Sequence, residues 1–175
     1  MTEKAEKTVK NTFGKGNPPI RRTVSAVTFG RFDIFVDGVV VSFTNKKAKE
    51  LVALCIDRKG GIVTMEDAVD KLWEPDVYDE KAKRRYRKAI ISAYRTLEEA
   101  GAKGVFVKIR GACFINARAI DCDFYKLLEL DEAAVKSFRG EYMYDYSWGE
   151  KTLAWINDIY CSRCGISEPD WLSEL

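Results

Sequence analysis

Apolar and polar residues alternate along Val24–Phe35, which is the pattern of a strand with one face against a core. The dipeptide Asp37-Gly38 follows, and it favours a two-residue hairpin turn because both residue types tolerate a positive φ. Val39–Phe43 then continues the apolar pattern. These three segments predict a small antiparallel sheet at the start of the domain.

After this hairpin the spacing of apolar residues changes to that of helices. The first predicted helix covers Lys46–Arg58, and Thr44 or Asn45 supplies its N-cap. Thr64 heads a second helix, with Asp67 placed three residues later as in a capping box. Two amphipathic helices therefore follow the sheet and are joined by a short extended link.

The second helix is expected to end at Glu74-Pro75, because proline cannot continue a helix. A third helix is predicted over Glu80–Ala100, and Gly101 ends it. Its stretch from residue 81 to residue 97 holds seven cations and no acidic residue. The inward face, set by the helical period, consists of Ala82, Tyr86, Ala89, Ile90, Ala93 and Leu97. The outward face consists of Arg84, Lys88, Ile91 and Arg95, with Arg87 and Ser92 on its flanks.

The outward face suits the DNA major groove, where Arg and Lys meet phosphates and guanine edges and an aliphatic group meets a thymine methyl. A solvated surface helix is the alternative, since most charged runs are only that. Surface helices usually mix charges of both signs, however, and so many like charges repel one another without a polyanion. The segment therefore favours nucleic acid.

Two short strands, Val105–Ile109 and Cys113–Ile115, are predicted around Arg110-Gly111, so that Arg110 stands at the tip of a hairpin with Lys108 beside it. Three helices followed by a β-hairpin make a winged helix-turn-helix. The predicted fold class is therefore α+β: a winged helix-turn-helix with an N-terminal antiparallel sheet, a C-terminal hairpin wing and a small helical extension.

The net charge of +2 hides two regions of opposite sign. Residues 1–120 hold 24 basic and 15 acidic residues, a balance of +9, whereas residues 121–175 hold 5 and 12, a balance of −7. This division indicates that a polyanionic ligand would bind to the basic residues 1–120 and not to the acidic residues 121–175. Histidine is absent, and the carboxylates show no clustered metal-ligand pattern. We therefore expect no enzyme, no cofactor and no metal site.

Residues 1–23 are polar and Lys-rich, and we expect a flexible linker or tail without a secretory signal. No apolar run approaches the roughly 20 residues that span a bilayer, so we expect a cytoplasmic protein that has no membrane partner. Its five cysteines are then expected to be reduced thiols. Cys161 and Cys164 have half of a zinc-knuckle spacing, but no second pair completes it.

The ordered set of motifs resembles the OmpR/PhoB-like DNA-binding domain, a winged helix preceded by a four-stranded sheet, and within it the SARP-type branch. The match covers about residues 24–120. It is carried by Phe29-Gly30-Arg31-Phe32, Asp37-Gly38, Lys46–Leu54, Gly60-Gly61-Ile62-Val63-Thr64, Leu72-Trp73 and Ile90–Leu97.

Residues 121–175 resemble a shortened form of the bacterial transcriptional activation domain that follows the winged helix in SARP-type proteins. Asp121–Tyr125, Phe138–Tyr142 and Tyr146–Trp148 carry this likeness, together with a helix from Gly149 to about Cys161. The resemblance also includes response regulators, in which case this chain is the effector half and the first 23 residues are a linker from a receiver domain.

Only the position of each residue on the outward face indicates whether it would contact DNA bases or the phosphate backbone. We expect Lys88 and Ile91 to meet bases, and Arg84, Arg85 and Arg95 to meet phosphates. The resemblance places Arg110 in the adjacent minor groove, although an ordinary soluble turn is equally consistent with it. Lys46 and Lys47 could contact phosphate at a helix N-terminus, and a solvated cap is the alternative.

Two function classes remain open from the sequence. The first is a sequence-specific regulator that binds double-stranded DNA at promoter repeats, with RNA polymerase and a second copy on DNA as partners. The second is a winged-helix protein-interaction module whose cations meet an acidic protein without DNA. The salt dependence of duplex binding distinguishes the two.

Overall fold

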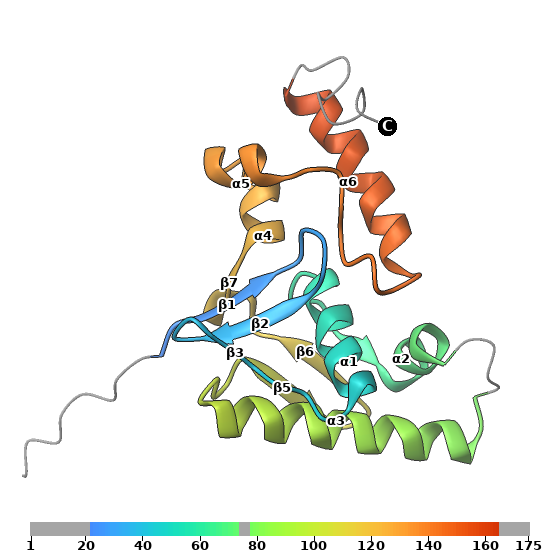
Figure 1. Cartoon of the computed structure of the whole chain (residues 1–175). Helices are drawn as coiled ribbons and strands as arrows, with labels where there is room; N and C mark the ends of the chain where they lie inside the picture. The colour runs from blue at the N-terminus through green and yellow to red at the C-terminus, as the bar shows by residue number, and fades with distance from the viewer. Residues whose placement is uncertain (1–21, 74–77, 165–175) are drawn as a thin grey trace, which may run out of the picture.

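The computed structural model describes residues 22–73 and 78–164, which form two small sheets and six α-helices over those ranges. The larger sheet has the strand order β3-β2-β1-β7. Its strands are β1 (Val24–Val27), β2 (Asp33–Val36), β3 (Val39–Val40) and β7 (Asp121–Cys122). β1, β2 and β3 pair antiparallel, whereas β7 lies parallel to β1 although almost one hundred residues separate them along the chain (Figure 1).

The predicted single strand Val24–Phe35 is two strands, which corrects the sequence interpretation. β1 and β2 are joined by a loop in which Gly30 has a φ of 82° and Phe32 is fully buried. The alternation of apolar residues continues through the loop because Phe32 points into the core as a strand residue would. Periodicity alone could not reveal the break.

The three helices that follow begin and end near the predicted residues. α1 (Lys46–Asp57) is capped by Asn45, whose side chain accepts hydrogen bonds from the backbone N–H groups of Lys47 and Ala48. α2 (Met65–Leu72) begins with the predicted capping box between Thr64 and Asp67. The predicted end of this helix at Glu74-Pro75 lies outside the described residues.

α3 (Glu80–Ala100) has the predicted bounds, because local signals fix both of its ends. The Asp79 side chain accepts a hydrogen bond from the N–H of Ala82, and Gly101 follows the helix in the left-handed region with a φ of 92°. α3 lies along the edge of the molecule (Figure 1), and its inner face packs on α1 and α2.

The second sheet has the order β4-β6-β5 and includes an antiparallel pair around Arg110-Gly111. β4 (Val63–Thr64) is the link between α1 and α2, and it pairs with β6 (Ala112–Ile115). β5 (Phe106–Ile109) pairs with the other edge of β6. The core lies between the two sheets and is centred on α1, in which every residue from Leu51 to Ile56 is buried. The mixed α+β class with two sheets is therefore confirmed.

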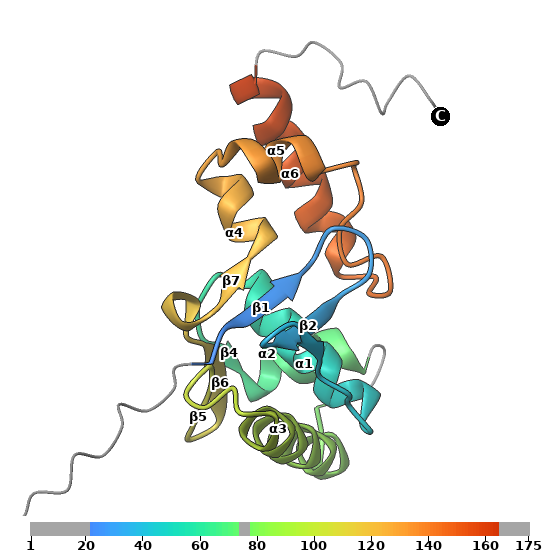
Figure 2. The ribbon, with the colours of Figure 1, turned by 60° about the vertical axis from the view of Figure 1, so that its left-hand side comes forward.

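The C-terminal extension contains more helices than the sequence indicated. A 3-10 turn (Ala117–Ala119) leads to β7, and α4 (Asp123–Leu128), α5 (Glu132–Ser137) and α6 (Gly149–Cys164) follow. These helices gather at the end of the molecule away from α3 (Figure 2). The boundary expected at residue 121 coincides with β7, which is a strand of the N-terminal sheet, so that the extension begins inside that sheet.

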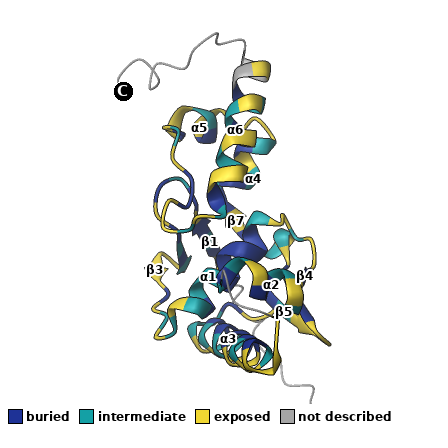
Figure 3. Ribbon diagram, turned by 90° about the vertical axis from the view of Figure 1, so that its right-hand side faces the viewer, coloured by how far each residue is buried: buried dark blue, intermediate teal, exposed yellow. Residues whose placement is uncertain are grey.

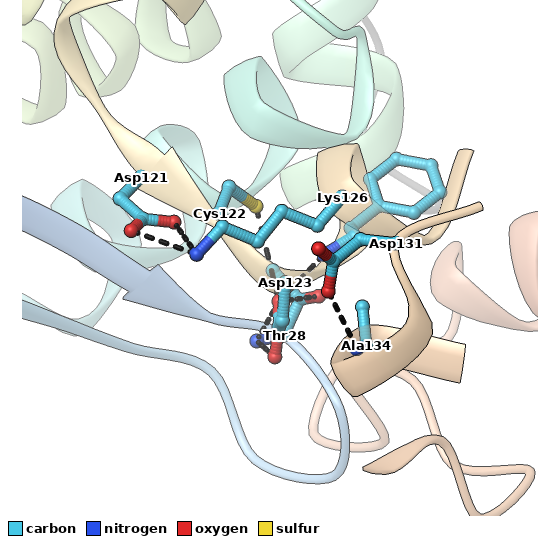
Figure 4. Close-up of polar contacts among 8 residues, drawn as sticks. Thr28, Asp121, Cys122, Asp123, Lys126, Asp131 and Ala134 are labelled. Atoms are coloured by element: carbon cyan, nitrogen blue, oxygen red, sulfur yellow. Dashed lines mark hydrogen bonds and ion pairs between the residues drawn. The ribbon is translucent and has the colours of Figure 1, made fainter. Parts of the chain in front are cut away.

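Asp123 holds the extension to the N-terminal sheet. Its carboxylate accepts hydrogen bonds from the backbone N–H of Thr28 at 2.9 Å, from the Thr28 hydroxyl at 2.6 Å and from the N–H of Phe29 at 3.1 Å. Figure 4 shows this carboxylate next to Thr28, with the Lys126–Asp121 ion pair nearby. One side chain therefore satisfies the backbone of a loop that lies 95 residues earlier in the chain.

Candidate nucleic-acid interface

The two faces of α3 differ in burial as the helical period predicts. All six residues of the inward face are buried, and the hydroxyl-bearing Tyr86 is only 2% exposed. On the outward face Ile91 is 45% exposed, and no other element covers this side in Figure 3. Four exposed cations of this face are among the predicted residues, namely Arg84, Arg87, Lys88 and Arg95.

These four exposed cations form no ion pair and no hydrogen bond within residues 22–73 and 78–164. Their positive field still acts locally, because the pKa of Glu80 is lowered first by its hydrogen bond to Lys83 and then by the charges of Lys83, Arg87 and Arg84. A face of unpaired cations around an exposed isoleucine has the composition that a polyanionic ligand requires.

The predicted residues Arg85 and Ser92, and the neighbouring Lys83, are less available to a ligand than the four exposed cations. Arg85 is half-buried and interacts within the molecule, and Ser92 is half-buried on the flank. Lys83 pairs with Glu80 at 2.8 Å, and its ammonium lies 5.1 Å from the ring centre of Tyr78. Position along the sequence could not separate the free cations from the occupied ones, because both kinds are Arg or Lys.

Lys81 is exposed on the outward face, and the sequence analysis left it out of the candidate residues. It lies three residues before Arg84 and seven before Lys88, so the helical period already places it on their side. Applying the period to every cation of the segment would have found it.

The hairpin β5–β6 places its two predicted cations differently. Arg110 is exposed at the tip beside Gly111, whose φ is 73°. The Lys108 ammonium lies 4.2 Å from the ring centre of Tyr94 on α3, within the range of a cation–π contact. Lys108 therefore joins the hairpin to the helix, and Arg110 is the cation of the pair that extends away from the body.

The N-terminus of α1 is only partly free for an anion. Asn45 already accepts hydrogen bonds from two of its first N–H groups, and Lys47 pairs with Glu50 at 2.7 Å. Lys46 is exposed and has no such pair among the described residues. Of the two lysines predicted here, Lys46 is the one with a charge available to a ligand.

Several aromatic residues of the extension pack against the N-terminal part. The Tyr142 hydroxyl donates to Asp57 of α1 at 3.0 Å, and Lys59 lies 4.1 Å from the ring centre of Trp155. Burial raises the pKa of Asp57, against the hydrogen bonds from Thr152 and Tyr142 that lower it. Tyr144 is 62% exposed, and Trp155 is still 40% exposed although Lys59 lies over its ring.

The described residues contain no cluster of three His, Cys, Asp or Glu side chains that could hold a metal ion. Among them there is also no helix of the length and hydropathy needed to cross a bilayer.

The comparisons with known proteins bear on the fold of this chain. No protein-family model matches the chain. No curated protein matches it either. Among solved structures, the chain is similar to Mycobacterium tuberculosis EmbR in complex with a low-affinity phosphopeptide, with a TM-score of 0.63 and 13% identity. The match covers 79% of this chain and 43% of the EmbR chain, so this chain spans less than half of that protein. At this identity the likeness concerns the fold alone.

Proposed function

We propose that this chain is a sequence-specific regulator of transcription that binds double-stranded DNA. α3 is its recognition helix in the major groove, and the hairpin at residues 105–116 is a wing on the adjacent minor groove. The observation that carries the proposal is the outward face of α3, where Arg84, Lys88 and Arg95 surround an exposed Ile91 and form no ion pair with any residue that the structure describes. The fold that the chain shares with EmbR and the resemblance to OmpR/PhoB-like and SARP-type domains support it.

The geometry ranks the remaining candidates for DNA contact. Arg87 and Lys81 extend the basic face along the backbone, and Arg110 is the wing cation that is free to enter a minor groove. Lys108 and Lys47 have internal partners, so their part is to position the wing and the first helix. Promoter repeats, a second copy on the DNA, RNA polymerase and a receiver domain upstream are parts of the same proposal that rest on the sequence resemblance.

The salt dependence of duplex binding tests the proposal. A random-sequence duplex with a fluorescent label is titrated at several salt concentrations, and anisotropy gives the affinity. If six to ten phosphates are contacted, affinity falls by ~10³–10⁵ between 50 and 200 mM salt. Lys88→Ala and Arg95→Ala should each weaken binding and reduce the salt slope by about 1, while the free energy of unfolding changes by less than ~0.5 kcal/mol.

Lys136→Ala is the matched control, because Lys136 is an exposed lysine of α5 that pairs with Glu132 far from α3. It should leave both affinity and slope unchanged. If the wild-type protein shows no duplex affinity even at low salt, DNA binding is refuted and a protein-interaction module is left. If Lys136→Ala reduces binding as much as Lys88→Ala, the assignment to α3 is wrong. Selection of bound sequences from a random pool then identifies the operator.

A further inference from the structure

Two thiols from distant parts of the chain meet in the core beneath α3. Cys55 on α1 and Cys113 on β6 are 58 residues apart in sequence, and their sulfur atoms are 3.5 Å apart. Both side chains are fully buried. The hydroxyl of Tyr86, on the inward face of α3, donates toward the Cys113 sulfur at 3.8 Å. The pair therefore lies where the first helix, the proposed recognition helix and the proposed wing come together.

The surroundings make the two thiols chemically unequal. Hydrogen bonds from Cys55 and Tyr86 lower the pKa of Cys113, against the effect of burial. Burial is the main reason that the pKa of Cys55 is raised. The thiolate is the nucleophile in sulfur chemistry, and a donated hydrogen bond stabilises it. Because the Tyr86 hydroxyl donates toward the Cys113 sulfur, we assign the first attack to Cys113 and the resolving role to Cys55.

We propose that Cys55 and Cys113 form a reversible disulfide when the protein meets a peroxide. The Cys113 sulfur attacks one peroxide oxygen, the O–O bond breaks, and the departing hydroxide takes the thiol proton to become water. Cys113 is then a sulfenic acid. The Cys55 sulfur loses its proton and attacks the Cys113 sulfur, the S–OH bond breaks, and the second oxygen leaves as water. Two thiols are oxidised to one disulfide, and one peroxide is reduced to two waters.

The structure selects this pair over the other buried thiol. Cys122 is also buried, but its sulfur donates to Asp123 at 3.8 Å rather than facing another cysteine, and burial is the first cause that raises its pKa to about 12. Formation of the disulfide requires the two sulfur atoms to approach to about 2.05 Å. That closure ties β6 to α1, and it changes the sulfur that the Tyr86 hydroxyl contacts from a thiol to a disulfide sulfur.

The cross-link is tested on the folded wild-type protein with hydrogen peroxide as the probe. After blocking of free thiols, digestion and mass spectrometry should find the peptides of Cys55 and Cys113 joined, and a reducing agent should separate them. Closing a loop of this length should also raise the melting temperature by roughly 10 °C. Cys122→Ser, and Cys161→Ser combined with Cys164→Ser, should leave the Cys55–Cys113 link in place.

Three outcomes would overturn the proposal: joined peptides only in urea, a link confined to Cys161 and Cys164, or Cys113 oxidised without joining Cys55. None of these readouts uses DNA, so the cross-link is judged separately from the proposed function. A further measurement rests on that function: the oxidised protein should differ in duplex affinity from the reduced protein, and Cys55→Ala should remove the difference. Equal affinities would mean that the cross-link does not regulate DNA binding.

Discussion

α3 and α4 are held in place by different kinds of contact. α3 carries its own start and stop signals, Asp79 and Gly101, and its outward cations Arg84, Lys88 and Arg95 pair with no residue in the described part of the chain. α4 has no side-chain cap, and Leu130 takes the left-handed position after it with a φ of 59°. Its place is fixed instead by contacts to residues far away in the sequence, such as the hydrogen bond from the Tyr125 hydroxyl to the carbonyl of Ile56.

α3 therefore presents an open surface, whereas α4 is held in place by its contacts with the rest of the protein. A recognition surface has to keep its shape while one face stays open, so strong local signals and a single packed face serve it well. In the extension, aromatic side chains face the N-terminal part. α4 has no side-chain N-cap, whereas α5 is capped by Asp131, whose carboxylate accepts from the N–H of Ala134. The contribution of the extension is then expected in the stability of the whole, and that of α3 in binding.

The largest effect is expected from Phe124→Ala in α4. Phe124 is fully buried, and its ring centre lies 5.0 Å from that of Tyr142 and 6.4 Å from that of Trp155. Removal of such a ring costs about 3–5 kcal/mol. Urea unfolding followed by circular dichroism should show one cooperative transition that moves as a unit. An early transition of the extension alone, with the rest unchanged, would mean that the extension is a separate body.

The next effect is expected at the junction, from Asp123→Asn. The carboxylate accepts from the backbone of Thr28 and Phe29 and from the Thr28 hydroxyl, and an amide keeps only one oxygen as acceptor. Loss of charge-assisted hydrogen bonds should lower the free energy of unfolding by about 1.5–3 kcal/mol. Duplex affinity measured well below the melting temperature should stay unchanged, because the outward face of α3 is untouched.

Asp121→Asn is the matched control, since Asp121 is an exposed carboxylate whose partner is Lys126. It should change the free energy of unfolding by less than ~0.5 kcal/mol. If the two variants are equally destabilised, general charge balance and not the contact with Thr28 explains the effect.

The same contrast explains which parts of the fold the sequence could predict. Local signals suffice for α1, α2 and α3, whose caps and apolar stripes are visible in the printed sequence. β7 could not be predicted, because two residues form it and its partner β1 lies at the other end of the domain. α4 and α5 are six residues each, too short for a periodic pattern to stand out.

The sequence predicts which face of α3 carries the candidate site, but not which of its cations are free of internal contacts. The helical period places Arg84, Lys88, Ile91 and Arg95 together, and their exposure agrees with it. Whether a cation has an internal partner depends on neighbouring elements, and the helical period contains no information about them. Lys108 shows this best, because its partner Tyr94 belongs to another element and only the packing of the hairpin on α3 brings them together.

The smallest effect is expected at the end of α4, from Leu130→Gly. Glycine removes the strain of a left-handed leucine, but it also removes an exposed apolar side chain that still makes some contacts, and it gives the unfolded chain more freedom. These contributions oppose one another, so the free energy of unfolding should stay within ~0.5 kcal/mol of the wild type. Gly101→Ala at the end of α3 should cost about 1–2 kcal/mol, because alanine is strained at this positive φ and its Cβ would lie 2.6 Å from Cδ of Arg22, whose side chain then has to move. Urea titrations measure the free energy of unfolding of both variants. If Leu130→Gly lowers it more than Gly101→Ala does, the extension relies on the Leu130 side chain, and the expected difference between the two helix ends is wrong.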